Sequence, residues 1–191
     1  MKIGLFFGSF NPIHNGHMAI AGYMAQYTDL DQVWFIVSPH NPLKEKKSLL
    51  KGYHRLAMVQ AATEDIDYLK ASDIEFGLPL PSYTTVTLAY LSEKYPAHKF
   101  ALIIGSDNLE NFHKWKNYEV ILNNYQLYVY PRTGYANHAL LQHSSVVLTQ
   151  APEVELSSTF IRDSISNQKD VRCFMPEKAW VYMHEMNFYK A

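Results

Sequence analysis

Short apolar runs alternate along the chain with longer segments whose apolar residues recur at helical spacing. The apolar runs predict strands at residues 2–7, 33–37, 71–76, 99–104, 127–130 and 146–148. Helical spacing predicts helices at residues 17–27, 53–64, 84–95, 108–115, 118–123, 158–166 and 177–186. Strands separated by helices are typical of an α/β fold. We therefore expect a Rossmann-like, doubly wound parallel sheet with helices on both faces and a short C-terminal helical extension.

Three loops that directly follow predicted strands carry the candidate chemistry. They span residues 8–16, 39–47 and 105–107. In a parallel sheet, ligands bind outside the carboxyl ends of the strands, near the point where the strand order reverses. We therefore expect these loops to converge on one crevice.

Length and composition narrow the class of protein. The 191 residues contain no evident repeat, which favours a single domain, 1–191. Apolar residues make up 48% of the chain, enough for a sizeable core, and the formal net charge of −1 argues against a nucleic-acid partner. No run approaches the ~20 apolar residues of a membrane span, and the apolar start of the chain leads directly into a polar loop, unlike a signal peptide. We expect a cytoplasmic protein with no membrane partner, and assembly into a homo-oligomer stays open.

The chain has one cysteine, Cys173. A lone cysteine cannot form an internal disulfide, and it lacks partners for a cysteine-based zinc site. Its neighbours Phe174 and Met175 are apolar, so we expect a buried thiol.

The first chemical motif follows the first predicted strand and reads Gly8-Ser9-Phe10-Asn11-Pro12-Ile13-His14-Asn15-Gly16-His17. Its two glycines let the backbone approach a ligand, and a helix that begins at His17 presents free N–H groups and its positive end there. Such a turn suits an anion, and both imidazoles can reach the same phosphate. The histidines could also be incidental to a turn. A zinc site is disfavoured, because no Glu follows His14 and no third ligand is evident.

The second motif is Ser157-Ser158-Thr159-Phe160-Ile161-Arg162. Ser158 is a good N-cap, and Arg162 lies one turn further along the same helix face. Hydroxyls, helix N–H groups and a guanidinium then point to one place, which again favours phosphate. Taken alone, the segment could be an ordinary capped helix with a surface arginine.

Together the two motifs indicate nucleotidyl transfer. That reaction needs donors at the α-phosphate, where charge grows in the transition state, and a clamp for the departing pyrophosphate. It needs no strong general base when the attacking group is a phosphate oxygen, which is already anionic at pH 7. The lack of an Asp or Glu in both motifs fits this chemistry.

The two motifs resemble signatures of the nucleotidyltransferase superfamily. Residues 8–17 resemble its (S/T)FxPxHxGH signature, and residues 157–162 are similar to the SSTxIR motif of bacterial nicotinate-nucleotide adenylyltransferases. The resemblance extends over essentially the full length: a Pro/His/Lys loop at 40–44, RxxM at 55–58, PSYT at 81–84, a GxD turn at 104–107, Trp115, an arginine at 131–132 and the final helix and tail at 181–189. The chain departs from the family pattern at Phe7, Asn11, Val86 and residues 78–80, and Ser9 keeps the hydroxyl of the usual Thr.

The resemblance implies adenylyl transfer from ATP to nicotinate mononucleotide. The mononucleotide 5′-phosphate attacks the ATP α-phosphate in line, giving deamido-NAD and pyrophosphate in NAD biosynthesis, with Mg²⁺ carried by the triphosphate. Implied catalytic residues are His14, His17 and Arg162. Implied ATP contacts are Gly8, Ser9, Phe10, Gly16, His17, Lys44, Gly105, Asp107, Ser157, Ser158, Thr159 and Arg162. Implied mononucleotide contacts are Ser9, Lys44, Tyr83, Thr84, Thr85, Trp115 and Arg132.

Some of these residues have a second interpretation. Lys44, like Lys46 and Lys47, could belong to a solvated loop instead of closing over the triphosphate. Trp115 could be a core residue instead of a plate for the nicotinate ring. Asp107 could cap the next helix instead of binding a ribose hydroxyl.

Other functions remain as alternatives. A nicotinamide-mononucleotide enzyme would carry the same motifs. A phosphopantetheine adenylyltransferase usually has Thr at the position of His14 and lacks the PSYT and SSTxIR pair, whereas a cytidylyltransferase would carry a segment near RTEGIST. A non-catalytic nucleotide sensor of the same fold would have lost His17 or Arg162, and both are present.

Overall fold

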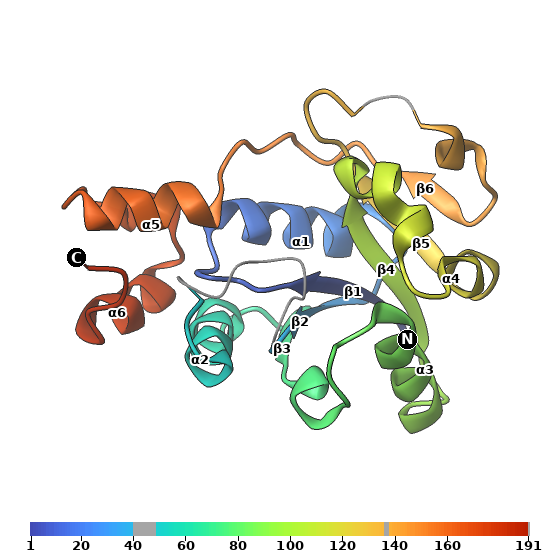
Figure 1. Cartoon of the computed structure of the whole chain (residues 1–191), viewed down its shortest axis with the longest axis horizontal. Helices are drawn as coiled ribbons and strands as arrows, with labels where there is room; N and C mark the ends of the chain where they lie inside the picture. Colours follow the sequence, from blue (N-terminus) through green and yellow to red (C-terminus); the bar gives the residue numbers. More distant parts are fainter. Residues whose placement is uncertain (40–48, 136–137, 191) are drawn as a thin grey trace.

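Six parallel strands form one sheet at the centre of the molecule (Figure 1). The structure, a computed structural model, describes residues 1–39, 49–135 and 138–190. The strands are β1 (Lys2–Gly8), β2 (Gln32–Val37), β3 (Leu69–Ser72), β4 (Lys99–Gly105), β5 (Gln126–Tyr130) and β6 (Val146–Leu148). Their order is β3-β2-β1-β4-β5-β6, with each neighbouring pair parallel. The order reverses between β1 and β4, so the ligand crevice of a doubly wound sheet is expected at their carboxyl ends.

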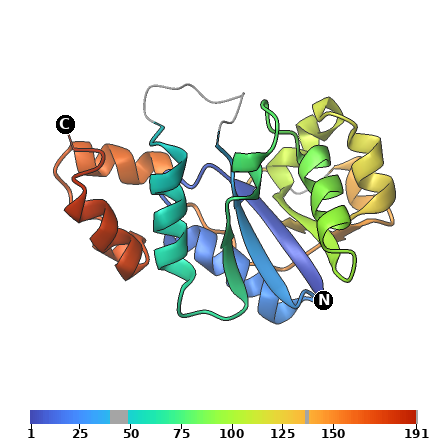
Figure 2. The ribbon, with the colours of Figure 1, turned by 90° about the horizontal axis from the view of Figure 1, so that it is seen from below.

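Helices cover both faces of this sheet, as Figure 2 shows from below. The α-helices are α1 (Asn15–Tyr27), α2 (Gly52–Thr63), α3 (Thr84–Lys94), α4 (Tyr118–Asn124), α5 (Ser158–Ser166) and α6 (Glu177–Glu185). Short 3₁₀ segments are η2 (Ile74–Gly77), η3 (Ser106–Lys114), η4 (Ala139–Gln142) and η5 (Arg172–Phe174). One core layer joins the sheet to α1, α2, α5 and α6, and the other joins it to α3, η3 and α4.

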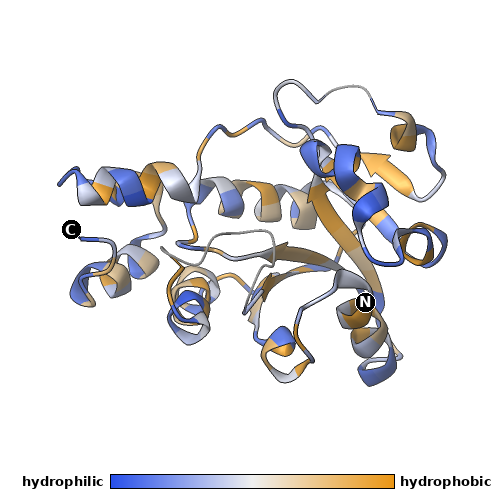
Figure 3. Ribbon diagram, in the orientation of Figure 1, coloured by the Kyte–Doolittle hydropathy of each residue, from blue (hydrophilic) through white to orange (hydrophobic). Residues whose placement is uncertain are grey.

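The chemistry of the strands explains this burial on both faces. Alternate residues of β1 enter opposite layers: Phe6 packs beneath α1 and α2, whereas Ile3 and Leu5 pack beneath α3 and η3. The strands are accordingly almost continuously hydrophobic, while the helices carry hydrophilic residues on their exposed sides (Figure 3). The expectation of a doubly wound Rossmann-like sheet with a C-terminal helical extension is confirmed. Within the described residues, no helix is both long and apolar enough to cross a membrane.

Three local expectations are wrong. The run at 71–76 is not one strand: β3 pairs with β2 over Leu69–Ser72, and the chain then turns into η2. Alternation of apolar residues in so short a run does not separate a strand from a turn. The segment predicted as a helix at 108–115 is the 3₁₀ segment η3. Cys173 is exposed, because η5 presents its middle to solvent between the buried Val171 and Met175.

Candidate active site

The histidine pair of the first motif forms a reciprocal cap at the start of α1. His14 is the N-cap, and its Nδ1 accepts a hydrogen bond from the backbone N–H of His17 at 3.3 Å. The Nδ1 of His17 accepts from the backbone N–H of His14, also at 3.3 Å. The two rings stack with centroids 3.6 Å apart. The helix therefore begins at Asn15 rather than His17, because an imidazole takes the capping role that Ser or Asp usually fills.

This cap determines which nitrogen of each neutral ring carries the proton. Because both Nδ1 atoms accept, a neutral imidazole in this arrangement carries its proton on Nε2. Burial, reinforced by the positive charge of Arg132, lowers the pKa of His14 from 6.5 to about 4. His14 is thus a neutral Nε2–H donor at pH 7.

Phe10 supports the histidine pair from inside the core. Its ring is 2% exposed and meets the rings of His17 and Phe35 with centroids 5.1 Å and 5.3 Å away. A Cβ on Gly8 would lie 2.7 Å from the Phe10 ring, so this position needs glycine. The side chain of Phe10 therefore orients His17, and the loop approaches β1 closely to make that contact.

The second motif packs directly against the first. Ser157, not Ser158, is the N-cap of α5, and its Oγ accepts from the backbone N–H of Phe160 at 3.1 Å. Ser158 instead donates its hydroxyl to the carbonyl of Pro12 at 2.8 Å. Arg162 donates to the carbonyl of Asn11 at 2.8 Å and to the hydroxyl of Thr159 at 3.1 Å. The structure thus brings the start of α5, its hydroxyls and the Arg162 guanidinium to residues 9–14, the loop that leads into α1 and is called the histidine loop below.

The turn after β4 lies beside this loop at the same end of the sheet. A Cβ on Gly105 would collide with Oδ1 of Asp107, because the carboxylate folds back over the glycine. No side chain caps η3, which has Gly105 as its N-cap, so Asp107 is not the cap that one interpretation expected. Arg132 follows β5, and its charge acts on His14. Its Nη1 donates to the carbonyl of Val154 at 3.2 Å, whereas its buried Nε has no partner among the described residues.

Four of the predicted mononucleotide residues form a second group. Tyr83, Thr84 and Thr85 lie at the start of α3, and the Thr85 hydroxyl donates to the Lys116 carbonyl at 2.9 Å. This bond joins the start of α3 to the residue after Trp115. The Trp115 ring is half-buried against Phe112 at a centroid distance of 5.1 Å. The backbone N–H groups of Val86 and Thr87 donate to the Tyr83 carbonyl, whereas those of Thr84 and Thr85 have no backbone acceptor among the described residues. Gly16 and Ser9 lie with the first group, and Lys44 lies outside the described residues.

Comparisons with known proteins agree with this geometry. The cytidylyltransferase-like family model matches residues 5–164. A relative from Flavobacterium psychrophilum, named "Probable nicotinate-nucleotide adenylyltransferase", is 55% identical over 100% of both chains. One of the same name from Bacteroides thetaiotaomicron is 45% identical over 97% of this chain and 92% of its own length.

The chain belongs to the nicotinate-nucleotide adenylyltransferases of the cytidylyltransferase-like family. Its fold is also that of a Plasmodium falciparum nicotinic acid mononucleotide adenylyltransferase solved with NaAD, with a TM-score of 0.81 at 17% identity. That match covers 98% of this chain and 97% of the other. The same Plasmodium enzyme solved with APC matches with a TM-score of 0.80.

Two buried residues, Arg55 and Glu75, support the structure around this site, and the sequence did not predict this role for either. Arg55 is fully buried and donates to the carbonyls of Ser9, Ser38 and Leu50 at 2.6, 2.8 and 2.9 Å. Glu75 is 2% exposed, accepts from the Thr87 hydroxyl at 2.8 Å, and has its pKa raised by burial. Arg55 is part of the RxxM segment, but that resemblance does not indicate which groups it bonds. Glu75 lies in the run at 71–76 that the apolar pattern predicts to be a strand.

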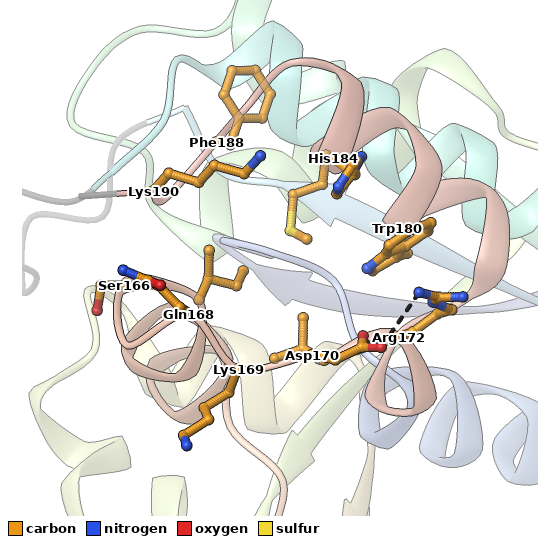
Figure 4. A pocket seen from close by; sticks show the side chains of 12 residues that line it. Ser166, Gln168, Lys169, Asp170, Arg172, Trp180, His184, Phe188 and Lys190 are labelled. Atoms are coloured by element: carbon orange, nitrogen blue, oxygen red, sulfur yellow. Dashed lines mark hydrogen bonds and ion pairs between the residues drawn. The ribbon is translucent and has the colours of Figure 1, made fainter.

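A cavity of about 550 Å³ lies away from these residues, between the end of α5 and α6 (Figure 4). Ser166, Trp180 and Lys190 line it, and it contains none of the predicted site residues. In the part of the chain that the structure describes, no group of three or more His, Cys, Asp or Glu side chains could hold a metal ion.

Proposed function

We propose that this protein transfers the adenylyl group of ATP to nicotinate mononucleotide, producing deamido-NAD and pyrophosphate. The observation that carries the proposal is the joining of the two phosphate motifs: Ser158 and Arg162 of α5 bond to the loop that presents His14 and His17. The chain's 55% identity over its full length to a relative of that name supports the same reaction. A nucleotide sensor that had lost either motif would not keep this joint arrangement.

In the proposed reaction, a phosphate oxygen of the mononucleotide attacks the α-phosphorus of ATP. The bond from that phosphorus to the bridging oxygen of the pyrophosphate breaks, and the pyrophosphate leaves with its electron pair. The Nε2–H groups of His14 and His17 donate to the α-phosphate, where negative charge grows in the transition state. The N–H groups at the start of α5, with Arg162, hold the leaving pyrophosphate.

At the other end, the flat base stacks on Trp115 while donors at the start of α3 meet the nicotinate carboxylate. Thr85 is already committed to the Lys116 carbonyl, so the backbone N–H groups of Thr84 and Thr85 are the proposed donors. The guanidinium of Arg132, whose charge already acts on His14, is a further proposed donor for the mononucleotide phosphate. A nicotinamide group would turn its NH₂ toward these donors, which costs about 1–3 kcal/mol for each group left unpaired.

We further propose that Mg²⁺ enters with ATP. Mg²⁺ commonly keeps several waters and binds through substrate phosphates rather than through an all-protein cage, and there it neutralises phosphate charge. Titration calorimetry tests this. Mg²⁺ added to the protein alone should give no binding heat at micromolar protein, whereas tight binding without nucleotide would contradict the proposal.

The direct test measures pyrophosphate release from ATP and Mg²⁺ with nicotinate mononucleotide, nicotinamide mononucleotide or phosphopantetheine, and identifies the products by mass. We expect deamido-NAD, with kcat/KM for nicotinate mononucleotide at least tenfold higher than for the nicotinamide form, as about 1.4 kcal/mol of discrimination requires. Equal kcat/KM values for the two mononucleotides would show that the proposed base pocket is wrong. Product from phosphopantetheine alone, or no product at all, would overturn the proposed reaction.

A further inference from the structure

The end of the chain returns to the histidine loop. After α6, the chain turns back through two non-glycine residues in the left-handed region, Asn187 at φ 54° and Tyr189 at φ 63°. Phe188 between them packs against the ring of His54 at 4.6 Å. Non-glycine residues seldom adopt this backbone conformation, so tertiary contacts must hold the tail in place. Figure 1 shows the end of the chain between α5 and α6.

The contact that the tail makes is specific. The Tyr189 hydroxyl donates to Oδ1 of Asn11 at 2.7 Å, across 178 positions of sequence. Burial raises the pKa of this hydroxyl well above its ordinary value, with Arg162 and Arg55 acting in the opposite direction. The hydroxyl therefore stays protonated, and a donor, at neutral pH.

Asn11 is where this contact becomes relevant to the histidines. The residue is 4% exposed, and the backbone N–H of Leu50 donates to the same Oδ1 at 3.2 Å. Its carbonyl accepts from Arg162 at 2.8 Å. Asn11 also lies between Phe10, which supports His17, and Pro12, which accepts from Ser158. A displacement of Asn11 would therefore be transmitted to both phosphate motifs.

We propose that Tyr189 is a positioning residue for the reaction, which rests on the proposed function. Its hydroxyl holds Asn11, and through Asn11 it holds the loop that aims His14 and His17 at the α-phosphate. In this proposal Tyr189 acts through Asn11 and not by direct contact with either substrate. Positioning of this kind acts on the transition state more than on substrate binding, so loss of the hydroxyl lowers kcat and leaves both KM values nearly unchanged.

Tyr189→Phe removes only the hydroxyl and keeps the ring that fills the site. Tyr182→Phe is the matched control, because the Tyr182 hydroxyl on α6 bonds to Nδ1 of His54 at 2.9 Å and does not reach the histidine loop. We expect kcat to fall about tenfold in Tyr189→Phe, the value of one net hydrogen bond, with both KM values within about twofold. Tyr182→Phe should keep kcat and show a similar fall in melting temperature.

A double-mutant cycle separates the route through Asn11 from a general loss of packing. In an Asn11→Ala background, Tyr189→Phe should have no further effect on kcat. An undiminished effect there would overturn the proposal. So would an unchanged kcat in Tyr189→Phe, or an equal loss in Tyr182→Phe.

A second measurement needs no turnover. NMR signals of the His14 and His17 rings in the substrate-free protein should shift in Tyr189→Phe and stay in place in Tyr182→Phe. Unshifted signals in Tyr189→Phe would overturn the positioning role even if the protein used another substrate. A wild-type protein without activity toward nicotinate mononucleotide, but with these shifts, would overturn the proposed function and keep the positioning contact.

Discussion

The phosphate end and the base end of the candidate site differ in how firmly the chain holds them. At the phosphate end, His14 is 4% exposed and capped by His17, and hydrogen bonds tie their loop to α5 and to the C-terminal tail. At the base end, Trp115 is half-buried and Lys116 is exposed. There, among the described residues, the hydrogen bond from the Thr85 hydroxyl to the Lys116 carbonyl joins the start of α3 to the segment that contains Trp115.

This difference fits the chemistry that we propose for each end. Transition-state stabilisation requires donors that are aimed before the substrate arrives, since reorganising them during the reaction would raise the barrier. Recognition of a flat base tolerates a more open platform. Substitutions at the phosphate end should therefore act on kcat, and substitutions at the base end on the KM of the mononucleotide.

The largest effect is expected for His17→Ala. Removing one donor that stabilises transition-state charge typically lowers kcat by about 10²–10³. ATP binding, measured by calorimetry, should weaken much less. His184→Ala is the control, because that exposed histidine stacks on Trp180 away from the site. Near-normal turnover of His17→Ala would remove the kinetic distinction between the two ends.

A second effect should appear in stability against pH. The pKa of His14 is about 4 in the folded protein against an ordinary 6.5, so the unfolded chain binds the proton first as pH falls. The free energy of unfolding should therefore fall between pH 6.5 and 4, by about 3 kcal/mol for a shift of this size. Denaturant unfolding at several pH values measures this loss. His14→Gln should flatten the curve in this window, and an unchanged slope would show that His14 is not buried as a neutral ring.

Trp115→Ala tests the base end. Losing the aromatic plate should raise the KM for nicotinate mononucleotide about tenfold, since stacking on an aromatic side chain contributes about 1–3 kcal/mol per base. The KM for ATP should stay within about twofold. Trp115→Phe keeps a plate and should recover most of the affinity. A defect confined to ATP would mean that the two ends have been assigned the wrong way round.

The smallest effect is expected for Lys116→Gln. The ammonium of Lys116 lies 4.3 Å from the centroid of the Tyr83 ring, so the base end has a cation that the PSYT segment itself lacks. An exposed charge contributes about 0–1 kcal/mol, so the preference for nicotinate over nicotinamide should fall about two- to fivefold. Raising the salt concentration should reduce the preference in the wild type in the same direction. Lys114→Gln, another exposed lysine of this region, is the control.

Most of the fold was predictable because its signals are local. The runs at β1, β2 and β4, and the helical spacing of α2, α3 and α5, depend on apolar periodicity within ten or so residues. Both phosphate motifs are also local: each is a short segment whose donors belong to a single turn. The convergence of the loops after β1 and β4 followed from the parallel sheet alone, since its carboxyl ends meet at one edge, whereas residues 40–47 of the third loop lie outside the described residues.

The sequence by itself therefore determined the sheet, the helices on both faces and the two phosphate motifs. Only the tertiary structure decided the contacts that hold them. It made His14 a helix cap, buried Glu75 in a run that resembled a strand, exposed Cys173 and brought Tyr189 to Asn11. The physical reason is separation along the chain: a hydrogen bond across 178 residues leaves no periodic pattern, and its partners meet only when the strand order places them at the same end of the sheet.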